Sequence, residues 1–229
     1  MVRPPERHEP ISLDAALLRS EIEASFARFG RELEAPAAFS LPSDGQIARL
    51  GRFLDILGLW RARLSLLSVS APLVILRDHV LDSLALLPWV HDNLRVADLG
   101  SGGGFPGVPL AIFRPGAELT LIESRRRRVS FLNEVARSLG LTNVRVIEAR
   151  GEEVVPGLCP PFDLTVCRAF ASIGETLEIA VPLTRPGGKI LSMKGERSAA
   201  QANESRRTPE VHSYTLAGGE PRKLVIYTV

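Results

Sequence analysis

From Leu94 onward, short apolar segments alternate with segments of helical pattern, and this alternation constrains the fold more than any other feature of the chain. The strand-like segments are 95–99, 118–123, 144–148, 163–168 and 189–193, and the helical ones are 107–113, 126–139 and 173–183. Strands that are apolar almost throughout are buried on both faces, as in a parallel sheet covered by helices. The pattern predicts an α/β fold with a doubly wound, mostly parallel sheet.

The last part of the chain has a different pattern. Residues 211–216 and 223–229 are strand-like, and Ala217-Gly-Gly-Glu220 joins them. A short glycine-rich connection is typical of antiparallel strands. We therefore expect an antiparallel C-terminal hairpin that completes a sheet of seven strands.

The first ninety residues have helical periodicity and no clear strand. Apolar residues recur at three- and four-residue steps over 13–33, and again after a capping-box pattern at Ser43 and Gln46. A third helix is expected over 72–88, with Pro72 in its first turn. We accordingly expect a flexible tail (1–10), an N-terminal helical extension (11–90) and an α/β domain (91–229).

The composition is that of a globular protein, since 45% of the 229 residues are hydrophobic and 24% are charged. Cys159 and Cys167 are the only cysteines, so we expect neither a disulfide framework nor a metal site. The chain starts without the apolar stretch of a signal peptide, and no apolar run is long enough to span a membrane. We expect a soluble, cytoplasmic monomer. The net charge is +2, and most of the basic residues are arginines, which is compatible with a nucleic-acid partner.

A glycine-rich loop follows the first expected strand, with the sequence Asp98-Leu-Gly-Ser-Gly-Gly-Gly-Phe-Pro-Gly107. Glycines at this density allow a tight turn and let a ligand approach the backbone closely. In an open parallel sheet, ligands bind at the carboxyl ends of the strands, beside the first strand. Glu123 ends the second expected strand, where its carboxylate can accept hydrogen bonds from both hydroxyls of a ribose. The loop therefore predicts a site for a nucleoside-containing ligand.

Two classes of cofactor use such a loop. The sequence from Gly102 matches the G-x-G-x-x-G pattern of dinucleotide-binding proteins. Gly100, Gly102 and Gly104 also match the D-x-G-x-G-x-G loop typical of S-adenosylmethionine-dependent methyltransferases. A pyrophosphate needs backbone N–H groups at a helix N-terminus, and Pro106 removes one of them. Because the carboxylate of Asp98 also suits a cationic ligand, S-adenosylmethionine is favoured.

The residues around the expected fourth strand narrow the choice of methyl acceptor. Exocyclic amines are usually held by an Asn/Asp-Pro-Pro-aromatic loop after that strand, but here Cys159-Pro-Pro-Phe162 lies before it. Carbon-5 methylation of a pyrimidine needs a cysteine nucleophile, whereas Cys167 lies in an apolar strand where we expect it to pack in the core. An acceptor with its own lone pair, such as a purine N7, needs no general base, and its catalysis can rest on proximity.

Together these motifs resemble the ribosomal RNA small subunit methyltransferase G family, also called glucose-inhibited division protein B, whose members methylate guanine N7 in a decoding-region loop of 16S ribosomal RNA. The glycine loop through Ala111 carries the resemblance, and further matches lie at 79–84, 120–124, 128–132, 167–172, 186–188 and 193–195. They cover the chain from about Leu54 to Gly195. The family's Trp-Asn…Asn-Leu-Thr run is represented by Trp60-Arg-Ala-Arg-Leu-Ser-Leu-Leu67, which keeps only the Trp and the Leu.

The resemblance implies that 91–229 is a Rossmann-like methyltransferase domain that binds S-adenosyl-L-methionine and acts on 16S ribosomal RNA or the small ribosomal subunit. It implies that Glu123 binds the ribose, that Gly151 and Glu152 flank the adenine, and that Arg168 completes the site. The cofactor-binding residues that we predict are Asp98, Gly100, Gly102, Gly104, Phe105, Glu123, Ser124, Gly151, Glu152 and Arg168.

Four residues are candidates for the transfer reaction itself, namely His79, Asp82, Arg168 and Lys194. His79 and Asp82 fall near one face of the third helix, where a structural role is as consistent as a catalytic or RNA-contacting one. Lys194, at the tip of the fifth strand, can reach an RNA phosphate. The run 125–128 places four arginines at the start of a helix, where cations oppose the helix dipole unless an anion lies nearby.

Two other functions stay open on the sequence alone. A methyltransferase of the same fold acting on a small molecule or a protein is consistent with the altered run at 60–67. A dinucleotide-binding oxidoreductase or sensor module is consistent with the literal G-x-G-x-x-G match.

Overall fold

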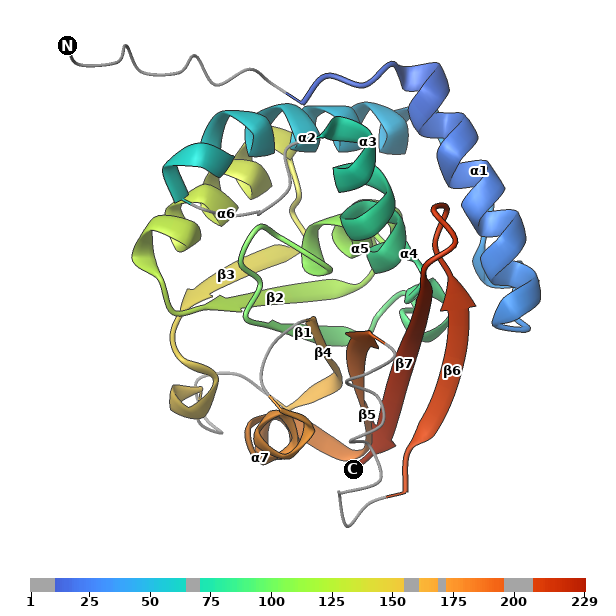
Figure 1. The fold of residues 1–229 in the computed structure, drawn as a ribbon. Helices are drawn as coiled ribbons and strands as arrows, with labels where there is room; N and C mark the ends of the chain where they lie inside the picture. Colours follow the sequence, from blue (N-terminus) through green and yellow to red (C-terminus); the bar gives the residue numbers. More distant parts are fainter. Residues whose placement is uncertain (1–10, 65–70, 155–160, 169–171, 196–207) are drawn as a thin grey trace, which may run out of the picture.

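The fold shown in Figure 1 comes from a computed structural model that describes residues 11–64, 71–154, 161–168, 172–195 and 208–229. The expected tail at 1–10 lies outside these residues. The strands are β1 (Arg95–Leu99), β2 (Glu118–Glu123), β3 (Val144–Glu148), β4 (Phe162–Arg168), β5 (Thr184–Gly195), β6 (Glu210–Thr215) and β7 (Pro221–Thr228). The helical segments are α1 (Ala15–Glu32), η1 (Pro36–Ala38), α2 (Asp44–Leu64), α3 (Pro72–Ile75), η2 (Leu76–Leu81), α4 (Asp82–Leu84), η3 (Leu87–Trp89), α5 (Gly107–Phe113), α6 (Arg126–Leu139), η4 (Gly151–Glu153) and α7 (Ile173–Leu183).

The strands form one sheet in the order β3-β2-β1-β4-β5-β7-β6. Neighbours from β3 to β5 pair in parallel, and β7 runs antiparallel to both β5 and β6 (Figure 1). The strand order reverses at β1, which puts the topological switch point at the carboxyl ends of β1 and β4. The predicted α/β class is confirmed, as are the doubly wound, mostly parallel sheet of seven strands and the antiparallel C-terminal hairpin.

Helices cover both faces of the sheet, and each face has its own apolar cluster. The larger cluster joins residues of α1, α2 and the η2 region to β1, β2, α5, α6 and the hairpin. The smaller cluster lies under α7, on the opposite face, and includes Cys167, as predicted from its apolar strand (Figure 1). The N-terminal helices thus share one core with the sheet, and the boundary expected near residue 90 stays a prediction. Among the described residues, no helix is long and apolar enough to cross a membrane.

Several local signals in the sequence act as expected. The Gln46 N–H donates to the Ser43 hydroxyl over 3.2 Å, and the Ser43 N–H donates to Gln46 Oε1 over 2.8 Å, which is the predicted capping box. Gly140 follows the last residue of α6 with a φ of 62°, in the left-handed region that ends many helices.

Two predicted boundaries are wrong by more than two residues, and the bounds of β4, β6 and β7 differ from the prediction by one or two. Strand β5 starts at Thr184 rather than at residue 189, because Thr184 already pairs with Phe162 of β4 before a register shift leads to the pair of Leu164 and Lys189. The third helix was expected to run regularly over 72–88. It ends at Leu84, and its middle part, η2, is π-helical. Such π segments are frequent at functional sites.

Candidate active site

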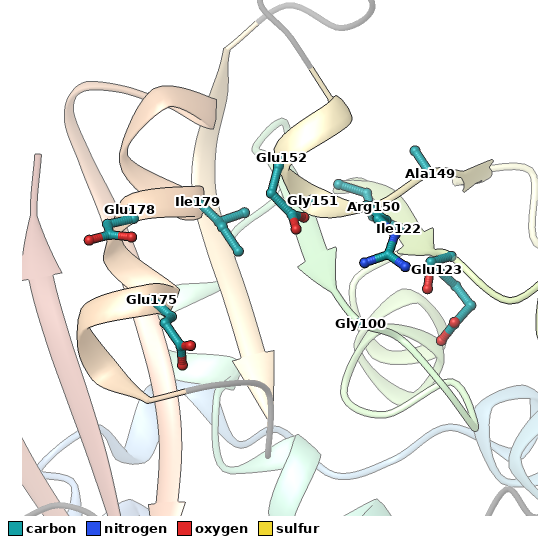
Figure 2. Close-up of a pocket in the computed structure, with 11 residues that line it drawn as sticks. Gly100, Ile122, Glu123, Ala149, Arg150, Gly151, Glu152, Glu175, Glu178 and Ile179 are labelled. Atoms are coloured by element: carbon teal, nitrogen blue, oxygen red, sulfur yellow. The ribbon is translucent and has the colours of Figure 1, made fainter.

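A pocket of about 440 Å³ opens at the carboxyl ends of β1, β2 and β3, which is a common volume for a small-molecule site. Its lining residues are Gly100, Ile122, Glu123, Ser124, Ala149, Arg150, Gly151, Glu152, Glu175, Glu178 and Ile179. Figure 2 shows α7 on one side of the pocket and the segments that follow β1, β2 and β3 on the other. The pocket lies beside the switch point of the sheet, at the carboxyl ends of parallel strands, where open α/β folds bind their ligands.

Five of the predicted cofactor-binding residues line this pocket together, namely Gly100, Glu123, Ser124, Gly151 and Glu152. Figure 2 labels all of these except Ser124. They come from three different strand ends, so the fold brings them together as the motifs implied. Arg150, Glu175, Glu178 and Ile179 also line it and were not predicted. Three of these residues lie in α7, the helix that was expected after the fourth strand. The apolar pattern of a helix predicts which face is buried, but it does not show which of the helix residues lie next to a loop from another strand.

Glu123 ties the glycine loop to the start of α6. Its side chain is 5% exposed, Oε2 accepts a hydrogen bond from the Gly102 N–H over 3.0 Å, and Oε1 accepts one from the Arg125 N–H over 2.8 Å. The guanidinium of Arg128 lies 3.8 Å from Oε2. Gly102 has a φ of 52°, a conformation that glycine adopts without strain. The buried carboxylate of Glu123 therefore fixes the glycine loop relative to α6, and Glu123 is itself one of the residues that line the pocket.

Asp98 lies beneath the loop, not in the pocket. It is completely buried, and its Oδ2 accepts a hydrogen bond from the Gly107 N–H, at the first turn of α5, over 3.0 Å. Its Oδ1 is also buried and has no hydrogen-bond partner among the described residues. Burial raises the pKa of Asp98 to about 7. The predicted residues Gly102, Gly104 and Phe105 likewise are not among the residues that line the pocket.

The raised pKa of Asp98 predicts a pH dependence of stability. An unfolded Asp ionises near pH 3.9, so between about pH 4 and 7 the folded protein keeps a proton that the unfolded chain has lost. The wild type should lose up to about 4 kcal/mol relative to Asp98→Asn across that window, with a constant difference above it. Urea unfolding of both proteins from pH 4.5 to 8.5 gives the free energy of unfolding at each pH. If the two free energies changed with pH in parallel, the pKa of Asp98 would not be raised.

A second cluster of polar side chains links the glycine loop to the N-terminal helices. Phe105 of the loop lies between the His79 ring of η2, with centroids 5.3 Å apart, and the guanidinium of Arg168, whose carbon is 5.9 Å from the Phe105 centroid. Arg168, at the end of β4, pairs through Nε with Asp82 Oδ2 over 3.2 Å. The structure therefore brings three of the four predicted reaction residues together around Phe105.

His79 is a neutral group in this cluster. Burial, together with the charges of Arg168 and Arg222, lowers its pKa to about 3. Its Nδ1 is buried and has no hydrogen-bond partner among the described residues. His79 can therefore pack against a flat ring or accept a hydrogen bond, but it does not act as a cation near neutral pH.

Two other sets of predicted residues lie apart from these contacts. Lys194 is in β5, paired with Lys223 of β7, and its side chain is outside the described part of the structure. Arg125, Arg126 and Arg127 lie at the start of α6, as predicted, and their side chains are exposed. The motif residues 169–171 are outside the described residues.

The strand order and the position of the pocket define the class of fold, a Rossmann-like α/β sheet with an antiparallel C-terminal hairpin. The chain resembles the C-terminal domain of precorrin-6Y C5,15-methyltransferase from Rhodobacter capsulatus, with a TM-score of 0.52 and 13% identity over 71% of this chain and 91% of that chain. It also resembles TrmN from Thermus thermophilus, with a TM-score of 0.51 and 20% identity over 66% of this chain and 49% of that chain. At these identities the likeness concerns the fold alone.

Sequence comparison identifies the family within this class. The family model of rRNA small subunit methyltransferase G matches residues 46–218. Curated relatives named ribosomal RNA small subunit methyltransferase G include one from Sorangium cellulosum, 42% identical over 69% of this chain and 68% of its own length, and one from Xanthomonas oryzae, 33% identical over 93% and 99%. The chain belongs to the rRNA small subunit methyltransferase G family, so the predicted membership and the methyltransferase class are confirmed.

Proposed function

We propose that this chain transfers a methyl group from S-adenosyl-L-methionine to N7 of a guanine in 16S ribosomal RNA. The observation that carries the proposal is the pocket at the switch point, lined by Gly100 and Glu123, in a chain of this family. The substrate and the cofactor come from the family's name and motifs, and the geometry of the site agrees with both. We further propose that the protein acts as a monomer on the RNA or on the small ribosomal subunit, in the cytoplasm.

The residues that line the pocket fit S-adenosylmethionine. The carboxylate of Glu123 is an acceptor suited to ribose hydroxyls, and Gly151 and Glu152 lie across the same pocket from α7. Ile122 and Ile179 supply apolar surface for a base. When bound, the cofactor supplies an electrophilic methyl group on a sulfonium. We propose Gly100, Glu123, Ser124, Gly151 and Glu152 as the residues that hold it, with Asp98, Gly102, Gly104, Phe105 and Arg168 shaping the loop around them.

A guanine N7 carries no proton, so methylation at this atom needs no general base. The cluster around Phe105 agrees with such a reaction, because its histidine is neutral with a pKa of about 3 and its carboxylate, Asp82, is already paired with Arg168. We propose that His79, Asp82 and Arg168 orient the acceptor nucleotide. Lys194 remains a proposed contact to an RNA phosphate.

The exposed arginines at the start of α6 support an RNA partner. Arg125, Arg126 and Arg127 place positive charge where the helix dipole is also positive, a cost of some tenths of a kcal/mol each. A phosphate backbone passing this helix end would remove that cost and add attraction. We therefore propose that the RNA backbone runs along the N-terminal end of α6.

Methyl transfer to RNA tests the proposed function directly. The protein is incubated with tritiated S-adenosylmethionine and small ribosomal subunits, or their naked RNA, from cells that lack the modification. We expect label in 16S RNA and, after borohydride reduction and aniline cleavage, a single strand break at one guanine. Label at another atom would reject the N7 assignment. Label in a cell extract that survives ribonuclease would instead favour a protein or small-molecule acceptor.

A further inference from the structure

The C-terminal hairpin sends a buried polar group into the cluster around Phe105. Tyr214 lies in β6, is 2% exposed, and donates a hydrogen bond from its hydroxyl to Asp82 Oδ1 over 2.6 Å. Its ring packs edge-on against Phe29 of α1, with centroids 5.6 Å apart. Neither the sequence motifs nor the pocket lining singled out this residue. The hydroxyl of a buried tyrosine usually has a hydrogen-bond partner. Here the partner is the carboxylate of Asp82, which also pairs with Arg168.

Asp82 connects Tyr214 to Arg168. One carboxylate oxygen accepts from the tyrosine, and the other pairs with Arg168 Nε over 3.2 Å. Arg168 Nη2 in turn donates to the Asp78 carbonyl oxygen of η2 over 2.7 Å. The two contacts hold the guanidinium over the ring of Phe105, and the Arg168 side chain is still 18% exposed. Its Nη1 group makes no hydrogen bond to a residue that the structure describes, and it is free to meet a ligand.

We propose that Tyr214 is a positioning residue, which orients the Asp82 carboxylate so that Arg168 faces the methyl acceptor. The proposal rests on the proposed function, because it takes Arg168 as an acceptor-side group. Both oxygens of Asp82 have a partner only when the carboxylate is oriented toward the Tyr214 hydroxyl on one side and toward Arg168 on the other. This orientation fixes the position of the Arg168 guanidinium. Without the hydroxyl, Oδ1 is buried and unpaired, and the carboxylate can rotate or take up a proton.

The charges that surround Asp82 give this proposal a measurable pH signature. Burial raises the pKa of Asp82, whereas the charge of Arg168, the Tyr214 hydroxyl and the charge of Arg222 lower it, and Asp78 raises it slightly. Removing the Tyr214 hydroxyl takes away one stabilising contact of the ionised form, so the pKa of Asp82 rises further. A protonated Asp82 no longer pairs with Arg168, and the acid limb of the activity profile should move to higher pH.

The test compares Tyr214→Phe with wild type in methyl transfer to 16S RNA from pH 5.5 to 8.5. We expect the acid limb of kcat/KM to move up by about one pH unit, so that transfer at a given pH on this limb falls about tenfold, while the Kd for S-adenosylhomocysteine changes less than twofold. Tyr227→Phe is the matched control. Tyr227 is the other tyrosine of the chain, equally buried but in the apolar cluster on the opposite face, and its loss should not move the limb.

A superimposable pH profile for Tyr214→Phe and wild type would overturn the proposal. The double variant Asp82→Asn/Tyr214→Phe adds a second criterion, because the loss of Tyr214 should cost nothing further once Asp82 cannot ionise. Infrared difference spectra against Asp82→Asn report the protonation of Asp82 without any transfer, and an unchanged midpoint in Tyr214→Phe would also overturn it. If the wild type labels no RNA, the proposed function fails, and the spectra still decide the role of Tyr214.

Discussion

We expect the Glu123→Gln variant to bind S-adenosylhomocysteine about a hundredfold more weakly than the wild type. In the wild type both carboxylate oxygens accept backbone hydrogen bonds, from Gly102 and from Arg125. A glutamine side chain has one acceptor oxygen, and its amide group would point N–H bonds at an N–H donor. The glycine loop then loses its fixed distance from α6, and the acceptor for the ribose is lost with it. Titration calorimetry at pH 7.5 measures the change.

Glu178→Gln is the control for this result. Glu178 lines the same pocket from α7, is exposed, and carries the same charge. Its substitution removes one negative charge from the rim without touching the loop, so the Kd should stay within about threefold. Equal losses for the two variants would mean that charge, and not the geometry held by Glu123, governs binding. An unchanged Kd for Glu123→Gln would remove Glu123 from the site.

Replacing Gly107 by alanine should destabilise the protein by about 3 kcal/mol and lower its Tm by about 6–10 °C. A Cβ at this position would collide with the side chain of Leu121 and would lie 2.6 Å from Asp98 Oδ2. Both neighbours are completely buried, so neither can move away freely. Asp98 would lose its hydrogen bond to the Gly107 N–H, and the start of α5 would shift under the loop.

Gly174→Ala serves as the comparison for Gly107→Ala. Gly174 lies in the first turn of α7, its φ is outside the left-handed region, and nothing lies within 4 Å of an added Cβ. Alanine there should leave stability unchanged or raise it by up to about 1 kcal/mol. Thermal unfolding of the two variants should therefore give shifts of clearly different size, and similar shifts would contradict the packing described around Gly107.

The periodicity of the sequence was enough to predict the sheet and most helices, because the central strands are mostly apolar and several boundaries carry a local signal. The turn 217–220 and Gly140 depend on contacts within a few residues, so they are visible in a single sequence. The glycine loop was also predictable, because its motif is local in sequence and its first glycine, Gly100, lines the pocket. Local chemistry explains all of these successes.

Contacts between distant segments were not predictable. Tyr214 and Asp82 are 132 residues apart, and nothing near either residue indicates the other. The π-helical form of η2 was not predicted, because its apolar residues also fit the spacing of a regular helix. Asp98 was expected to face a cationic ligand, whereas the structure buries it under α5. The sequence shows that Asp98 lies near the end of a strand, but it does not show which neighbouring segment covers its side chain.

Calorimetry of the RNA-free protein with two ligands tests the account most directly. We predict that S-adenosylhomocysteine titrates one site per chain, and that NAD at the same concentrations gives no heat of binding. Saturation by NAD, or the absence of any heat with S-adenosylhomocysteine, would mean that the pocket between Glu123 and α7 does not hold a methyl donor.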